Sequence, residues 1–240
     1  MKQLVYFIIA LFLTASVYGQ DTINQTDANG KKQGFWKKTA ADGKKLYEGH
    51  FKNGKPCGEF HYYYDDGVTK AVSQFSADGR TTMTRAFFPN GKPMAEGRFV
   101  DEKREGLWKF YSEQDGALIS EENYRNGKKE GVAKNFFPGQ GVAELSNFRD
   151  GIHEGTWEQY YADGKVKFRC TYKNDMKEGP VTGYSASGKV LMNGTYKNGS
   201  PDGLWTYFDE KGKVTKKETY ERGLLIKKEG ELEKDDGGPK

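Results

Sequence analysis

The sequence predicts an all-β protein, built as an elongated single-layer antiparallel β-meander of about eight hairpin repeats. Three observations predict this fold. A motif of about 24 residues recurs eight times, turn dipeptides recur about every 12 residues, and aromatic residues reach 14% although hydrophobic residues total only 35%. Self-similarity at a fixed period indicates a repeat architecture in which each unit contacts mainly its neighbours. The composition is too aromatic for a disordered chain and too polar for a thick two-layer core.

Each repeat opens with a small residue, carries a Trp slot two positions later, and closes with an aromatic residue. The opening positions are Gly34, Gly58, Met83, Gly106, Gly131, Gly155, Gly179 and Gly203. The closing aromatics are Phe51, Phe75, Phe99, Tyr124, Phe148, Tyr172, Tyr196 and Tyr220.

Turn dipeptides predict how the strands of one unit pair. Asp-Gly pairs such as the one ending at Gly164 supply the positive φ that two-residue hairpin turns need. A two-residue turn there places Gly155 opposite Tyr172 and Trp157 opposite Cys170. We infer that the small opening residue makes room for the closing ring across the strand pair.

Turns of the Asn-Gly type predict the pairing between units. A turn at Asn53-Gly54 places Gly58 beside Gly49 and Phe60 beside Tyr47. Neighbouring side chains across strands share a face, so this register extends one face along all the repeats.

The two sets of aromatics are predicted to lie on opposite faces, because an odd spacing along a strand changes the face. The Trp slot and the closing aromatics form internal packing on one face. A second aromatic follows three residues after the Trp slot and remains accessible near the hairpin tips, beside Lys70, Lys167 and Thr215. Exposed aromatic patches often mark partner sites. The candidate binding residues are therefore Tyr63, Tyr111, Tyr160, Tyr184 and Phe208.

Units three and four depart from the pattern. Unit three has Met83 in the Gly slot and Arg85 in the Trp slot, and unit four needs an extra residue before Tyr124. We expect irregular strand pairing and the fastest amide exchange in this middle region.

The segment Tyr47-Glu48-Gly49-His50-Phe51, with its following Asn-Gly-Lys, resembles a MORN repeat, and weaker copies recur around Gly97 and Gly194. The looser Gly-x-Trp-x-x-Tyr spacing is similar to the bacterial MORN variant found in proteins labelled YwqK-type antitoxins. The resemblance implies a single-layer antiparallel sheet used for contact with proteins or lipids, and in some relatives an antitoxin or immunity role.

The ends of the chain predict export. Lys2 and the apolar stretch 4–13 have the features of a secretory signal peptide over 1–19. A polar lead-in covers 20–29, the repeat domain 30–226, and a charged, disordered tail 227–240. The mature protein is then periplasmic, on the cell surface or extracellular. The open alternative to cleavage is a short membrane anchor.

Two cysteines could form one disulfide in an exported chain. Cys57 lies in unit two and Cys170 in unit six. An extended sheet separates them by roughly 40 Å, far beyond the Cα separation of about 7 Å that a disulfide allows. We therefore predict two free thiols.

No catalytic or metal constellation stands out. The three histidines form no ligand pair, and Gly183-Tyr-Ser185-Ala-Ser187 misses the nucleophile-elbow pattern at its fifth residue. The net charge of +4 is spread over interspersed acidic and basic residues, which argues against nucleic-acid binding. We predict neither an enzyme nor a cofactor.

These observations together predict an exported repeat protein that presents a long β surface to another protein, as a scaffold or as an immunity-like partner of a toxin. The alternative is binding of an envelope glycan or lipid surface through aromatic stacking.

Overall fold

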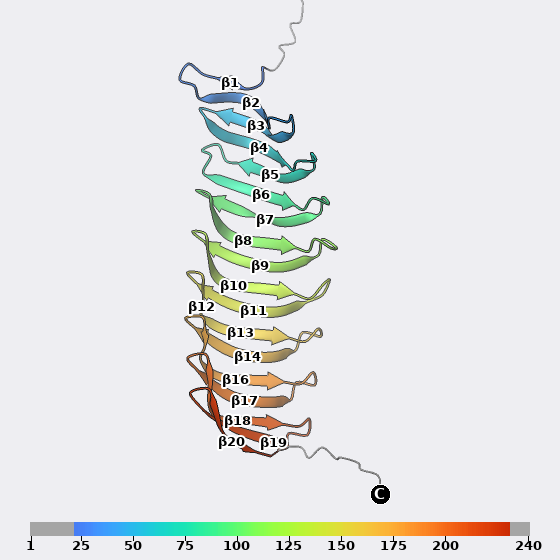
Figure 1. The fold of residues 1–240 in the computed structure, drawn as a ribbon, viewed down its shortest axis with the longest axis vertical. Coiled ribbons are helices and arrows are strands. Elements are labelled where there is room, and N and C mark those ends of the chain that lie inside the picture. Colours follow the sequence, from blue (N-terminus) through green and yellow to red (C-terminus); the bar gives the residue numbers. More distant parts are fainter. Residues whose placement is uncertain (1–21, 231–240) are drawn as a thin grey trace, which may run out of the picture.

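The computed structural model describes residues 22–230 as one antiparallel sheet of 20 strands (Figure 1). Each strand pairs with the strands before and after it in the chain, so that the hairpins stack along one long axis with β1 and β20 at opposite ends. The predicted all-β meander is confirmed. No segment of 22–230 forms a helix of the length and apolarity needed to cross a membrane.

Two long strands are each interrupted by one residue. One interruption separates β12 from β13, and the other separates β15 from β16. The strands are β1 (Gln25–Thr26), β2 (Lys32–Thr39), β3 (Lys45–Lys52), β4 (Lys55–Tyr63), β5 (Thr69–Phe75), β6 (Thr81–Phe87), β7 (Pro93–Val100), β8 (Lys103–Tyr111), β9 (Leu118–Arg125), β10 (Lys128–Phe136), β11 (Val142–Arg149), β12 (Ile152–His153), β13 (Gly155–Tyr160), β14 (Val166–Lys173), β15 (Met176–Lys177), β16 (Gly179–Tyr184), β17 (Val190–Lys197), β18 (Ser200–Phe208), β19 (Val214–Glu221) and β20 (Leu224–Glu229).

Turns between units are the predicted two-residue type, except for the longer loop between β5 and β6. Asn53 and Gly54 have φ values of 53° and 80°, and they join Lys52 directly to its partner Lys55. Positive φ at both central residues is the type I′ geometry, whose twist matches that of the flanking strands.

Turns inside units are longer than predicted. The Tyr161 N–H donates to Lys165 O at 2.8 Å and encloses a three-residue loop that ends at Gly164, with φ of 84°. The register then shifts by one residue: Gln159 pairs with Phe168, but the next residue, Tyr160, pairs with Val166. This bulge compensates for the extra loop residue, and it is the usual companion of a three-residue hairpin loop.

Beyond the bulge, the predicted register within units is confirmed. Gly155 faces Tyr172 and Trp157 faces Cys170. Gly34 faces Phe51 in the same way at the other end of the sheet.

The predicted register between units is wrong by two residues. Gly49 pairs with Phe60, and the next pair along is His50 with Cys57, so Gly58 and its neighbour have no partner on β3. Because the shift is two residues, the side chains beyond it keep their predicted face.

The opening glycines also have a different role from the predicted one. Gly58 has φ of 69°, and a Cβ added there would meet open space. It is therefore needed for the left-handed backbone at the shift and not for clearance of the closing ring. The rings instead lie over glycines of the preceding strand, since a Cβ at Gly97 would overlap Trp108 and one at Gly194 would overlap Trp205.

One residue from each of β2 to β11, β13, β14 and β16 to β19 forms a central column along the sheet, and we call this side the ring face. Large rings are separated in the column by one or more smaller side chains, and most of the buried residues belong to it. In order along the sheet the column is Trp36, Gly49, Phe60, Ser73, Thr84, Gly97, Trp108, Glu122, Ala133, Ser146, Trp157, Cys170, Val181, Gly194, Trp205 and Glu218. Phe60, Trp108 and Trp205 are 2–4% exposed. This column is the core of the single layer.

Unit three lacks the register shift. β5 and β6 pair regularly, with Thr82 opposite Phe75 and Thr84 opposite Ser73. The expectation of irregular pairing here is therefore wrong. The Gly and Trp slots of the motif are occupied by Thr82 and Thr84, and not by Met83 and Arg85 as predicted. A threonine does not adopt positive φ cheaply, so the strand runs straight where other units shift.

Unit four follows the common pattern. Gly106 faces Tyr124, and the extra residue lies in the turn closed by the bond from the Ser112 N–H to Ala117 O at 2.8 Å.

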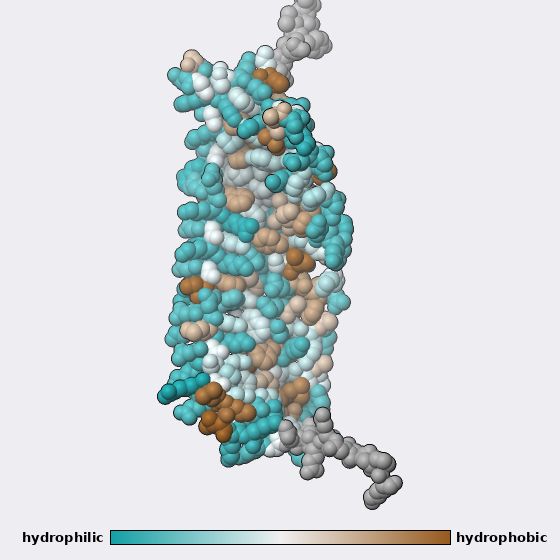
Figure 2. Space-filling model, viewed as in Figure 1, coloured by the Kyte–Doolittle hydropathy of each residue, from teal (hydrophilic) through white to brown (hydrophobic). Residues whose placement is uncertain are grey.

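Pairing extends beyond the predicted repeat domain at both ends. β1 pairs with β2 inside the predicted lead-in, and β20 continues to Glu229, into the predicted tail. The predicted signal peptide and residues 231–240 of the predicted tail lie outside the described residues. Leu224 and Ile226 of β20 are 72% and 59% exposed, and the hydropathy surface has an apolar cluster at that end (Figure 2).

Both cysteines are free thiols, on β4 and β14. Nine strand spacings separate the two strands, or about 43 Å at ~4.8 Å per strand.

Candidate binding surface

The five predicted binding residues occupy one position in five units, at the last residue of β4, β8, β13, β16 and β18. We call the side opposite the ring face the tyrosine face. All five side chains are half-buried. These residues are Tyr63, Tyr111, Tyr160, Tyr184 and Phe208.

Three of the tyrosines are held by glutamates. The Tyr111 hydroxyl donates to Glu96 Oε1 at 2.7 Å from the neighbouring hairpin, and Tyr63 donates to Glu48 in the same way. Tyr160 donates to Glu158, two residues earlier on its own strand. The rings are thus fixed in orientation by a charged acceptor, which makes a stronger hydrogen bond than a neutral one.

These contacts change the proton affinity of the groups. Partial burial and the Glu96 carboxylate raise the pKa of Tyr111 to about 12, and Tyr63 has the same shift from burial and Glu48. In return, the hydrogen bond from Tyr111 lowers the pKa of Glu96. Near neutral pH the pair is a neutral phenol donating to a carboxylate.

Basic side chains complete this network. Arg85 Nε lies 3.2 Å from Glu96 Oε2, and Arg169 Nε lies 2.6 Å from Glu158 Oε1. Lys45 Nζ lies 4.5 Å from the centre of the Tyr63 ring, within cation–π range. The tyrosine face therefore combines half-buried rings with charges of both signs.

The predicted neighbours of these rings are wrong in detail. Lys70 and Lys167 lie over Tyr64 and Tyr161, one residue beyond the candidate tyrosines. Tyr161 in turn donates from its hydroxyl to Tyr184 O at 2.8 Å in the next hairpin. The Lys-over-ring contacts therefore belong to the hairpin tips, which they help to stack.

On the ring face, sequence reasoning missed a set of basic side chains that cover the rings. Arg104 lies 4.7 Å from the centre of the Trp108 ring, and Lys177 lies 5.7 Å from that of Trp157. In the sequence, each of these residues stands two positions before the opening glycine of its unit, a pattern that could have predicted the contacts. The set is Lys32, Arg104, Lys129 and Lys177.

Catalytic features are weak in this arrangement. Within residues 22–230 no three His, Cys, Asp or Glu side chains are placed to hold a metal ion together. Ser185 lies in the connection after β16, and its hydroxyl is 2.7 Å from that of Ser187. That the protein is not an enzyme stays a prediction.

Three consecutive repeats match the MORN repeat variant. The matched residues are 154–174, 177–198 and 201–222, which correspond to units six, seven and eight. A family known for repeated β-hairpins agrees with the fold described above. No curated protein matches the chain.

Similar solved structures are distant. A mutant of S. aureus TarM in complex with fondaparinux, α-GlcNAc-glycerol and UDP has 15% identity and a TM-score of 0.25, over 51% of this chain and 19% of that one. A second TarM structure has 16% identity and a TM-score of 0.27, over 52% and 20%. The TcdB2-TccC3-TEV structure has 10% identity and a TM-score of 0.21, over 82% and 14%. The chain spans a fifth or less of these proteins, and likenesses of this size carry no argument.

Proposed function

We propose that this chain is an exported, non-enzymatic repeat protein whose tyrosine face binds another protein, as a scaffold or as an immunity-like partner of a toxin. The observation that carries the proposal is the row of half-buried rings at one position of five units, with glutamates orienting three of them. Rings held in place before binding lose little conformational entropy when a partner docks. The match of three repeats to the MORN variant supports a role in binding.

A triple substitution tests the tyrosine face. Replacing Tyr111, Tyr160 and Tyr184 by Ser removes three rings and should weaken partner capture from envelope extract at least about tenfold. The matched control replaces the same residues by Phe, which keeps the rings and removes only the hydroxyls. It should retain most of the binding.

Far-UV circular dichroism and the melting temperature separate the outcomes. Unchanged spectra with lost capture support the proposal, whereas unfolding of the Ser variant assigns these rings to structure. Unchanged capture by a folded Ser variant places the partner surface elsewhere. If purified glycans or lipid vesicles bind the wild type and lose binding in the Ser variant, the glycan or lipid alternative replaces a protein partner.

Export has its own test. The protein expressed in its native host should have an intact mass corresponding to a chain that begins near Gln20. A full-length cytoplasmic product would contradict both the export and a partner in the envelope.

A further inference from the structure

Unit three leaves a hollow on the ring face, about 730 Å³ in volume. Ser73 and Thr84 form its floor, and Phe75 and Phe99 form its sides. Arg80 is at its rim. We call this space the unit-three hollow.

The neighbouring units show what occupies this position elsewhere. The Phe60 ring lies between Phe51 and Phe75, at centroid distances of 5.2 and 5.0 Å and interplanar angles of 82° and 69°. The Trp108 ring lies between Phe99 and Tyr124 at 4.7 and 6.5 Å, both at 74°. Each of these two column rings is thus held edge-to-face by two closing aromatics, a favoured geometry for aromatic pairs.

In unit three the two flanking rings remain but the central ring is missing. Phe75 contacts Phe60 on its far side, and Phe99 contacts Trp108 on its far side. Between them the column residue is Thr84, which is too small to reach either ring edge-on. The hollow therefore has the aromatic walls of a ring site without the ring.

Units five and seven also lack a column ring, but their own basic side chains cover the gap. Lys129 lies 5.0 Å from the Phe148 ring centre and 2.7 Å from the carboxylate of Glu122, a column residue. Lys177 lies within 6 Å of the Trp157, Phe168 and Tyr196 ring centres.

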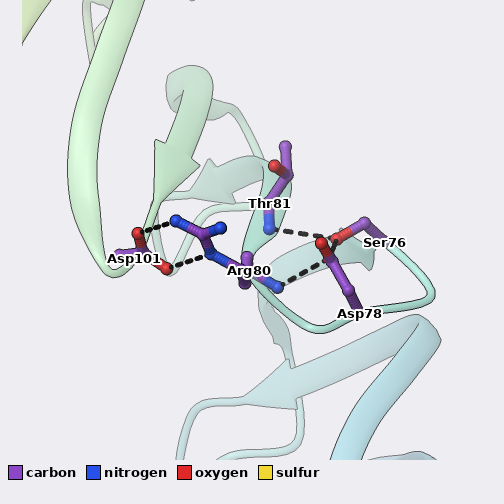
Figure 3. A network of polar contacts seen from close by, with 5 residues as sticks. All are labelled: Ser76, Asp78, Arg80, Thr81 and Asp101. Carbon is purple, nitrogen blue, oxygen red and sulfur yellow. Dashed lines mark hydrogen bonds and ion pairs between the residues drawn. The ribbon is translucent and has the colours of Figure 1, made fainter.

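The corresponding residue of unit three is held away from the hollow. Arg80 lies two residues before Thr82, the position that Lys129 and Lys177 have relative to their opening glycines. Its guanidinium makes a two-point contact with Asp101 at the rim, with Nε to Oδ1 at 2.9 Å and Nη2 to Oδ2 at 2.7 Å (Figure 3). The Arg80 N–H also donates to Asp78 Oδ1 at 3.0 Å, which fixes the loop that carries it. The space stays open because this arginine is paired elsewhere.

The floor of the hollow decides which guest fits. The Ser73 and Thr84 hydroxyls lie 2.9 Å apart and bond each other, so the floor is neutral. Unit five, in contrast, places the Glu122 carboxylate against its lysine. A cationic guest would find no charge on the unit-three floor, and at the rim the Asp101 carboxylate is already paired with Arg80. A neutral ring would meet two aromatic walls and the flat side of that ion pair.

We infer that the unit-three hollow is a second binding site, which takes an aromatic side chain, tryptophan first, from a protein partner. It lies on the face opposite the tyrosine row and does not depend on the function proposed for that row. The inserted ring would complete the column of rings at the one unit where neither a ring nor a basic side chain of the chain itself covers it.

The test uses N-acetyl-tryptophanamide as the probe and the full chain, isotope-labelled for NMR. We expect saturable shifts in the amide signals of β5, β6 and β7, and none with N-acetyl-lysinamide or methyl glucoside. Thr84→Trp fills the hollow from within and should weaken probe binding at least tenfold, with an equal or higher melting temperature. Leu204→Trp, at a position 54% exposed in unit eight, is the matched control and should bind as the wild type does.

A second variant leaves the floor and the walls intact. Asp101→Ala frees Arg80 to cover the rings and should weaken the probe several-fold, and Arg80→Ala in that background should restore binding. The inference is overturned if the wild type does not bind the probe, if the shifts map to other strands, or if both Thr84→Trp and Asp101→Ala bind unchanged. Stronger binding of methyl glucoside than of the probe would make the hollow a sugar site and overturn it equally.

Discussion

Units six to eight and unit three share one topology but are held together differently. In units six to eight an opening glycine allows the ladder to shift, and large column side chains such as Trp205 pack over small ones such as Gly194. In unit three Thr82 occupies the glycine position, the ladder runs straight, and Thr84 leaves the column uncovered.

The connections between units differ in the same way. Glu178 precedes the opening glycine of unit seven, and its carboxylate accepts the Asn198 N–H of the following turn at 2.8 Å. Unit two has Cys57 at the corresponding position, and a longer loop closed by the bond from the Ser76 N–H to Thr81 O replaces the two-residue turn. In unit two, loss of the glutamate coincides with loss of the two-residue turn that follows it.

The comparison shows that strand pairing and apolar cover are separate properties of this sheet. Backbone hydrogen bonds continue through unit three, but the side-chain layer over them is thin. In a one-dimensional array each interface contributes its own stability, so a weak interface remains local.

The largest expected effect compares how much stability the column side chains contribute in the two regions. Trp205→Ala removes a ring that is 4% exposed and should lower the free energy of unfolding by about 3–5 kcal/mol. Thr84→Ala, at the same column position of unit three, should cost about 1 kcal/mol or less. Urea unfolding of both variants measures the difference. Equal losses would show that the two regions are packed alike.

The next effect tests the fit of ring over glycine. Gly194→Ala places a methyl group where the Trp205 ring lies and should cost about 1–3 kcal/mol. In a Trp205→Ala background the same change should cost almost nothing, because the ring that it displaces is gone. Identical costs in the two backgrounds would mean that the glycine serves the backbone alone.

Hydrogen exchange compares the two regions without mutation. Amides of β6 should exchange on the order of tenfold faster than those of β18, although both strands are paired on each side. The cause is the thin side-chain layer of unit three and not irregular pairing. Equal protection of the amides along the whole sheet would instead show that the backbone hydrogen bonds, and not the side-chain layer, determine local stability.

The smallest effect concerns alkaline pH. The pKa of Tyr111 is raised to about 12, against an ordinary value of about 10. A raised tyrosine pKa stabilises the fold fully below pH 10, and this contribution is lost as the pH rises to 12. Tyr111→Phe should flatten the stability profile in that window.

Ultraviolet titration supplies the check. The phenolate absorbance of Tyr63, Tyr111 and Tyr160 should appear near pH 12 instead of near pH 10. In unit three the structurally equivalent residue, at the end of β6, is Phe87, which contributes no such signal. A Tyr111→Phe difference spectrum centred near pH 10 would contradict the hydrogen bond to Glu96.

Local chemistry explains why much of the architecture was predictable. Asn-Gly and Asp-Gly mark turns through their own backbone preferences, and alternation along a strand assigns faces without any knowledge of neighbours. The pairing of Gly155 with Tyr172 and the opposite faces of Trp157 and Tyr160 both follow from these rules.

The two-residue shift at Gly58 was not predictable in this way. An ungapped pairing beside the Asn53-Gly54 turn is equally consistent with local rules. The shifted one prevails because it sets Phe60 over Gly49, a packing preference between two strands. The glutamate partners of Tyr63 and Tyr111 were missed for the same reason, since they lie in the preceding hairpin.

The sequence by itself determined the repeat, the order of the strands, the positions of the turns and, outside unit three, the face of each motif residue, because these depend on residues close together in the chain. Only the tertiary structure decided the register between units, the basic side chains over the rings and the unit-three hollow. Those features depend on which side chains fit against each other across separate hairpins. Arg80 illustrates the difference, because its place beside Asp101 depends on a contact across 21 residues of chain.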